Sequence, residues 1–133
     1  MRKILIGIMT AMLTASVGAA FAQDYPTRTI TVVVPFPAGG GADTVARIIG
    51  EKLSVALRQQ IVIDNRPSGG AILGARVVAK AAPDGYTLLL GHTGTISINP
   101  SLYTNVGYDP RTDFAPIGLI ATIPIGAKSV RGS

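Results

Sequence analysis

Three short apolar runs, separated by two stretches with helical periodicity, constrain the fold of this chain more than any other feature. The runs cover 30–34, 61–63 and 86–90, and β-branched residues or leucine fill most of their positions. Almost continuous apolar runs suit strands buried on both faces of a parallel sheet. Between them, 42–57 and 71–82 repeat apolar residues at spacings of three and four. This alternation predicts right-handed βαβ units, so the expected fold class is α/β, with a parallel-core sheet and flanking helices.

The helical stretches allow finer predictions. Asp43 or Thr44 can cap the first one, and Arg47 follows Asp43 by one turn on the same face. The residues expected to face the sheet are Val45, Ile48, Ile49, Leu53, Ala56 and Leu57 in the first stretch, and Leu73, Val77 and Ala81 in the second. Later in the chain, 96–103 is expected to form a short helix interrupted by Pro100, and 117–123 a fourth strand.

The amino terminus has the pattern of a secretory signal. Arg2 and Lys3 precede a mostly apolar run over 4–17, and Ala20-Phe21-Ala22 has the form that signal peptidase accepts. An uncleaved membrane anchor is the alternative, but a spanning helix needs about 20 predominantly apolar residues. We therefore expect 1–22 to be a cleaved signal peptide and the remaining chain to be soluble in the periplasm.

Composition excludes several classes of protein. The chain has 12 basic and seven acidic residues, yet the basic residues are scattered and there is no tryptophan, so nucleic acid is not an expected partner. The absence of cysteine excludes disulfides, thiolate metal sites and a cysteine nucleophile. A single histidine is too few for an ordinary metal site, so no metal and no cofactor are expected.

Two loops rich in small residues follow the first and third predicted strands. In an open α/β sheet, ligands bind outside the carboxyl ends of the strands. The first loop leads into a helix, whose start presents free backbone amides and the positive end of the helix dipole, so a carboxylate or a phosphate is the natural ligand. The candidate ligand-binding residues are Pro37, Ala38, Gly39, Gly40, Gly41, Ala42, Asp43 and Thr44 in the first loop, and His92, Thr93, Gly94 and Thr95 in the second.

Each of these candidates also has a purely structural interpretation. The first loop can be a flexible connection, Asp43 can be a helix cap instead of a partner for a ligand ammonium group, and His92 can be solvated. The hydroxyl groups of Thr93 and Thr95 can bind a carboxylate or close a local turn. An enzyme that uses the loop as an anion site is a further alternative, although the chain has no Gly-Lys pair, no G-x-S-x-G motif and no paired carboxylates, and no catalytic residue is proposed.

An ordered set of short motifs resembles one known family. The motifs resemble the amino-terminal part of the Bug family, the periplasmic receptors of tripartite tricarboxylate transporters. They are Val34 to Asp43, Ala46-Arg47, Asp64 to Pro67, Val78 to Leu88, Tyr108 to Pro110 and Asp113 to Pro116.

The resemblance implies a periplasmic-binding-protein type II fold, in which two lobes close on a ligand. It implies an amino acid, a di- or tricarboxylate or an aromatic acid as ligand, held by the two loops named above, and a membrane permease as partner. It also implies that 23–123 is part of the first lobe and that 124–133 no longer resembles the family. We therefore expect a receptor truncated before its second lobe and impaired by that truncation, or alternatively the non-functional product of a broken reading frame.

Two positions depart from the family pattern. Arg58 stands where the family usually has glycine, after the first helix. Around Gly70, Ala71 and Ile72 the family is richer in glycine, and Ile72 replaces a usually polar residue.

Overall fold

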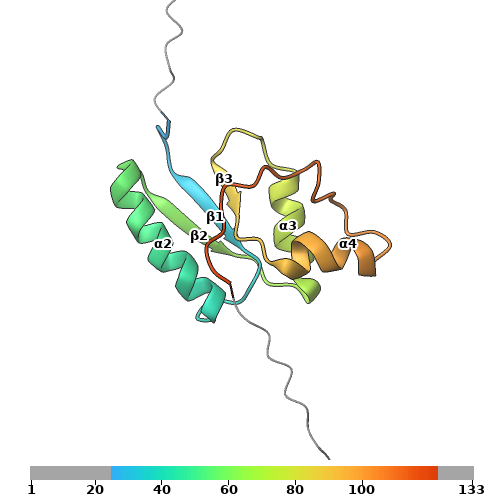
Figure 1. Ribbon diagram of the computed structural model, residues 1–133. Helices are drawn as coiled ribbons and strands as arrows, with labels where there is room; N and C mark the ends of the chain where they lie inside the picture. The colour runs from blue at the N-terminus through green and yellow to red at the C-terminus, as the bar shows by residue number, and fades with distance from the viewer. Residues whose placement is uncertain (1–24, 123–133) are drawn as a thin grey trace, which may run out of the picture.

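The computed structural model describes residues 25–122, which form a small three-stranded sheet with helices packed around it (Figure 1). Along the chain the elements are β1 (Ile30–Val34), α2 (Gly41–Leu57), β2 (Ile61–Asn65), η1 (Gly69–Ala71), α3 (Ile72–Ala79), β3 (Thr87–Leu89), η2 (Gly94–Ile98) and α4 (Asn99–Leu102). The predicted alternation of strands and helices is therefore confirmed, and with it the α/β class.

The sheet is parallel, with β1 between β2 and β3. In its middle, Val32 pairs with Ile63 on one side and with Leu88 on the other. The central strand also supplies the best-buried large side chains, since Ile30, Val33 and Val34 are almost completely enclosed. The apolar run that predicted β1 thus corresponds to a strand covered on both faces.

The two long helices cover opposite faces of this sheet. A methyl group placed on Gly50 of α2 would lie 3.3 Å from Ile61 Cγ2 and 3.4 Å from Ile63 Cδ1, so α2 packs closely on that face. A methyl group on Gly74 of α3 would lie 3.4 Å from Val33 Cγ1. Side chains alternate along a strand, and the register places Val33 on the face opposite to Ile61 and Ile63. Each crossover therefore runs over its own face of the sheet.

Small residues make the contacts of α2 and α3 with the sheet. The prediction of which helix residues face the sheet is therefore partly wrong. Ile48 of α2 is 52% exposed and Leu73 of α3 is 45% exposed, although both were expected to face the sheet. Leu53 and Ala56 of α2 were expected there too and are also exposed. Ala46 and Ala75 are buried instead. A helix approaches a sheet most closely where its side chains are short, and this moves the larger neighbours to the sides of the contact.

The second and third helical regions also differ from prediction in detail. A break precedes α3 because Gly70 and Ala71 adopt left-handed backbone angles, with φ of 65° and 60°. Pro100 lies in the first turn of α4, where proline is well tolerated, so it begins this helix and does not interrupt one.

The predicted fourth strand is absent from the described part of the chain. Residues 117–122 form no regular element, and Ile117 and Leu119 are 83% and 85% exposed. A strand needs a neighbouring strand edge to pair with and a face to bury, and this segment has neither. Ile123, the last residue of the predicted strand, lies outside the described residues. The expected signal peptide (1–22) and the expected tail (124–133) lie outside them as well. Within 25–122, no helix combines the length and the apolar character that crossing a membrane requires.

Candidate functional site

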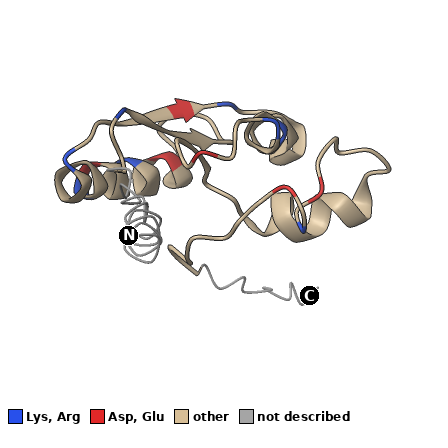
Figure 2. Cartoon of the chain, turned by 90° about the horizontal axis from the view of Figure 1, so that it is seen from above, with Lys and Arg blue, Asp and Glu red and all other residues tan. Residues whose placement is uncertain are grey.

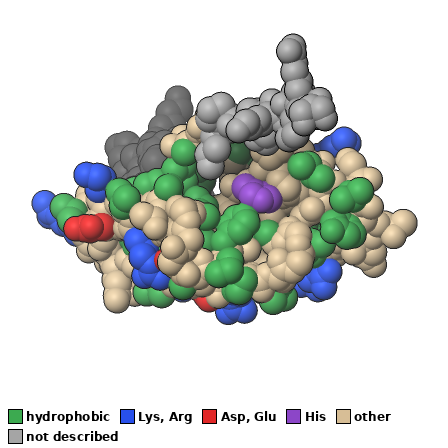
Figure 3. All heavy atoms as spheres, turned by 90° about the horizontal axis from the view of Figure 1, so that it is seen from below, with side chains coloured by type: hydrophobic (Ala, Val, Ile, Leu, Met, Phe, Trp, Pro, Cys, Tyr) green, Lys and Arg blue, Asp and Glu red, His purple; other side chains and the backbone are tan. Residues whose placement is uncertain are grey.

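Both predicted loops lie at the carboxyl ends of neighbouring parallel strands. β1 continues through 35–40 into α2 and then to β2 on one side, whereas β3 lies on the other side of β1. This is a topological switch point, where the two loops leave the sheet in different directions, and open α/β sheets bind ligands at such points. Figure 3 shows this end of the sheet, with the single histidine of the chain at the molecular surface.

The start of α2 differs from the predicted side-chain cap. The cap residue is Gly40, and no side chain makes a capping hydrogen bond. Instead, the Thr44 amide and hydroxyl both donate to the Gly40 carbonyl, at 2.9 and 3.1 Å. The carboxylate of Asp43 accepts the Gly39 amide, which precedes the helix, at 2.8 Å. Neither Asp43 nor Thr44 therefore acts as the N-cap.

Some amides of the first loop are used by the protein itself and others are not. The Gly39 amide is occupied by Asp43, and the Gly40 amide donates weakly to the Pro37 carbonyl at 3.4 Å. The amides of Gly41, Ala42 and Asp43 have no acceptor among the described residues. These three donors form the first turn of a helix of 17 residues. The expected anion site therefore reduces to this first turn.

Asp43 is the centre of a buried polar network under the loop. It is only 2% exposed, and its Oδ2 accepts Arg47 Nε at 2.9 Å while its Oδ1 accepts Asn65 Nδ2 at 3.0 Å. The Arg47 guanidinium, followed by the Gly39 amide and Asn65, lowers the pKa of Asp43 from 3.8 to about 2. Because both carboxylate oxygens have internal partners, these contacts favour a role in fastening the loop over a contact with a ligand ammonium group.

Asn65 is a member of this site that the sequence reasoning missed. It is the last residue of β2, and its amide group donates to the Phe36 carbonyl at 3.1 Å as well as to Asp43. It thereby ties the loop after β1 to the neighbouring strand and to the first turn of α2. The sequence did offer a signal that Asn65 belongs to the site. It follows a predicted strand, at the end of the sheet where the two glycine-rich loops were also expected.

In the second loop, Thr95 closes a local turn. Its side chain is fully buried, and its hydroxyl donates to the His92 carbonyl at 2.9 Å and lies 3.0 Å from the His92 amide that donates to it. The Thr95 carbonyl accepts the Tyr108 hydroxyl at 2.7 Å. Of the two threonines proposed as ligand donors, Thr93 is exposed, whereas the Thr95 hydroxyl is engaged within the protein.

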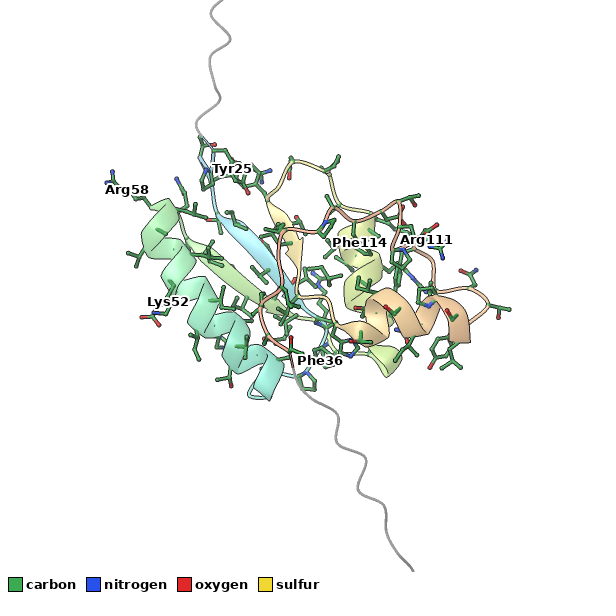
Figure 4. The ribbon with its side chains drawn as sticks, viewed as in Figure 1. Tyr25, Phe36, Lys52, Arg58, Arg111 and Phe114 are labelled. Carbon is green, nitrogen blue, oxygen red and sulfur yellow. The ribbon has the colours of Figure 1, made fainter. Side chains whose placement is uncertain are left out.

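An aromatic contact brings the two loops together. The His92 ring lies 4.9 Å from the Phe36 ring, centroid to centroid, at an interplanar angle of 53°. Figure 4 shows Phe36 close to the start of α2, so His92 and the α2 amides border the same end of the sheet. Phe36 was not among the predicted site residues, although it belongs to the first loop.

Charged residues do not gather into a second candidate site in the described part of the chain. Figure 2 shows the basic residues distributed over several elements, and no three His, Cys, Asp or Glu residues gather as a possible metal site anywhere in 25–122. The candidate groups at this end of the sheet are therefore backbone amides, one imidazole and an aromatic ring.

Comparison with known proteins agrees with this architecture. The sequence pattern of the tripartite tricarboxylate transporter family receptor matches residues 45–130. A Pseudomonas protein from the tcbD-tcbE intergenic region is 46% identical over 123 residues, which cover 92% of this chain and 36% of that protein. Protein BugT of Bordetella pertussis is 37% identical over 122 residues, and these cover 37% of BugT. The chain thus spans about a third of the length of the curated relatives that it matches.

Solved structures give the same result. MatC from Rhodopseudomonas palustris with bound malate superposes with a TM-score of 0.69 at 47% identity, covering 72% of this chain and 33% of MatC. The periplasmic binding protein BugD superposes with a TM-score of 0.67 at 48% identity, covering 71% of this chain and 31% of BugD. Three findings point to one family: the parallel α/β sheet with this strand order, the ordered motifs, and the family match over most of the chain. The chain belongs to the receptor family of the tripartite tricarboxylate transporters.

Proposed function

We propose that this chain provides ligand-binding residues of the first lobe of a periplasmic receptor, and that the receptor holds a small carboxylate without changing it chemically. The observation that carries the proposal is the set of free amides at Gly41, Ala42 and Asp43, placed at a topological switch point. Three convergent N–H donors at a helix start, together with the helix dipole, stabilise an anionic oxygen group. The family is a receptor family, which agrees with binding in place of catalysis.

The ligand class follows from the donors and from the neighbours. Backbone amides at a helix start recognise any compact anion, but related structures hold malate in MatC and adipate in another R. palustris protein, and both are dicarboxylates. We infer that a small organic acid is the ligand here, with one carboxylate on the α2 amides. Amino acids and tri- or aromatic carboxylates share that group and remain in the same class.

The rest of the proposal concerns export and partners. Residues 1–22 would direct the chain to the periplasm and be removed, and 23–123 would form part of the first lobe, followed by a tail over 124–133. A permease of the tripartite type would receive the ligand from the complete receptor. Since a second lobe encloses the ligand in two-lobed receptors, we expect the first lobe alone to bind weakly, in the millimolar range.

The experiment is an NMR titration of the ¹⁵N-labelled protein, expressed as the whole chain in a bacterial host and purified from the fraction that contains it. Malate and adipate should shift the amide resonances of Gly41, Ala42 and Asp43 in a saturable manner, and the uncharged diamide of malate should not. No shift with any acid at millimolar concentration would refute the proposal.

A matched pair of variants sharpens the test. Gly41→Pro removes one donor while keeping the helix, since proline is favoured at the first helical position and Gly40 already has the extended backbone, with ψ of 170°, that precedes proline. Gly41→Ala keeps the donor and adds a methyl group that meets nothing within 4 Å. We expect Gly41→Pro to weaken malate binding about tenfold, as the loss of a hydrogen bond to a charged group does. Gly41→Ala should bind as the parent chain does.

A further inference from the structure

The outer strand β2 has a free edge. Figure 1 shows β2 at one side of the sheet, beside α2, and β1 is its single strand neighbour among the described residues. The Gln60 carbonyl and the Arg66 amide both bond to β1. Because backbone groups alternate along a strand, those of Ile61 and Ile63 point away from β1, and no described residue pairs with them. Such an edge is a template for a further strand.

A groove of about 410 Å³ runs along this edge, on the face of the sheet that α2 covers. Val55 on its rim is 78% exposed, and on the opposite face of the sheet the Val62 side chain is 39% exposed. Residues 61–63 include no charged residue and no proline, which are the usual protection of an edge strand. The groove is lined by Arg47, Gly50, Glu51, Ser54, Val55, Ile61 and Ile63.

The groove carries two charges of opposite sign. Glu51 has no ion-pair partner among the described residues. Arg47 uses Nε for Asp43 and Nη2 for Asn65, and its Nη1 has no acceptor within 25–122. An acid and a base on one rim complement a surface that presents the same pair in the reverse order. A two-fold axis supplies that order from a second copy of this chain.

The packing of Gly50 indicates where this axis lies. A methyl group on Gly50 would be 3.3 Å from Ile61 Cγ2 and 3.4 Å from Ile63 Cδ1, so Gly50 is level with Val62 between them. We propose that two copies of this chain associate through β2, antiparallel about Val62, and join their three-stranded sheets into one. Ile61 of each copy then exchanges backbone hydrogen bonds with Ile63 of the other, and the two Val62 side chains meet.

The two α2 helices fit side by side on this joined sheet. Each α2 packs on its own β1 and β2, so the two helices lie two strand spacings, or about 10 Å, apart. Packed helices are about 8–10 Å apart, so the second α2 closes the groove of the first. At a rise of roughly 1.5 Å per residue, Arg47 is offset along the axis by about 3 Å from Glu51 of the second copy, within reach of both side chains.

The contact leaves the proposed ligand site open and does not depend on it. The groove begins at Arg47, whereas the free amides belong to Gly41, Ala42 and Asp43 at the start of the same helix. Val62→Lys, which should dissociate the dimer, should therefore bind malate as the parent chain does. Each of the two proposals can thus fail without the other.

The direct test is sedimentation equilibrium of the whole-chain protein between about 10 µM and about 1 mM, because small interfaces are weak. The mass should rise from that of a monomer toward that of a dimer. Hydrogen exchange followed by NMR should slow at the Ile61 and Ile63 amides as the concentration rises. The amides of Val62 and Asp64 face β1 in the monomer already and are the internal control.

Variants at two positions test the contact itself. Val62→Lys places two like charges opposite each other and should weaken the dimer at least about tenfold. Leu102→Lys is the matched control, because it introduces the same charge at a 69% exposed residue of α4, and it should dimerise as the parent chain does. Glu51→Lys brings a like charge to Arg47 of the second copy and should weaken the dimer about tenfold, whereas Glu51→Gln should have a smaller effect.

The remaining outcomes would overturn the proposal. A monomer throughout the concentration range contradicts it. A dimer that Val62→Lys leaves intact, or that does not protect the Ile61 and Ile63 amides, forms through another surface and contradicts it as well. If Val62→Lys does not fold, as judged by its ¹⁵N spectrum at low concentration, Glu51→Lys and the exchange of the two amides decide.

Discussion

The carboxylate of Asp43 accepts the backbone amide of Gly39 at 2.8 Å, so the loop that leads into α2 is closed onto the first turn of that same helix. This contact uses the amide before the helix and leaves those of the first turn without an internal acceptor among the described residues. The negative charge is balanced by Arg47, one turn further along α2, at 2.9 Å. A buried acid thus lies beside the free amides of the first turn with its own charge balanced within the protein.

The first prediction concerns acid stability. The pKa of Asp43 is about 2 in the folded chain against 3.8 without these contacts, so the folded state binds a proton there less readily than the unfolded state. The stabilisation by Asp43 is therefore present above about pH 4 and is lost as the pH falls toward 2. Urea unfolding at pH 5, 3 and 2 should show this loss, and Asp43→Asn should be less stable at pH 5 and flatter over the same range. An unchanged pH profile in that variant would contradict the prediction.

Asn65→Ala should loosen the first loop. It removes the donor to the Phe36 carbonyl and to Asp43, both of them partly buried, and should lower the free energy of unfolding by about 1–3 kcal/mol. Hydrogen exchange of the amides around Gly39 should accelerate more than that of β3. Gln60→Ala, at an exposed position before the same strand, is the control and should change stability by less than about 0.5 kcal/mol.

Arg58→Gly should stabilise the chain. Arg58 ends α2 in the left-handed region, with φ of 52° and ψ of 32°, which costs a residue with a side chain roughly 1 kcal/mol relative to glycine. Thermal or urea unfolding should show an increase of about that size in the free energy of unfolding. Lys52→Gly is the opposite control, since glycine within α2 should cost about 1 kcal/mol. Equal effects of both variants would mean that the cap geometry is not the cause.

Gly74→Ala should destabilise the packing of α3 on the sheet. Its new methyl group would lie 2.8 Å from Pro35 Cβ and 3.1 Å from Pro35 Cα, so the helix has to move, at a cost of about 1–3 kcal/mol. Gly69→Ala, whose methyl group meets nothing within 4 Å, controls for the exchange itself. The comparison is made by urea unfolding, and a stable Gly74→Ala variant would show that α3 tolerates a wider separation.

Local sequence patterns were enough to predict the three strands, the two helices between them and their order, but the predicted fourth strand was wrong. The run of β-branched residues in β1 and the helical spacing over α2 predicted their types. A strand buried on both faces has a nearly continuous apolar run, whereas a helix buried on one face has apolar residues at spacings of three and four. The pair of Asp43 and Arg47 was predictable for the same reason, since residues four apart in a helix share a face. Both loops were found at strand ends, where parallel α/β sheets bind ligands.

Only the tertiary structure decided which groups meet across the loops and which parts of each helix touch the sheet. Asn65 reaches Phe36 and Asp43 from a different strand, and His92 packs on Phe36 from a third one, so neither contact has a spacing that a sequence pattern could reveal. Close approach at Gly50 and Gly74 likewise depends on how the helices lie on the sheet. Contacts between distant segments follow from chain packing, and that packing is a property of the whole fold and not of any local stretch.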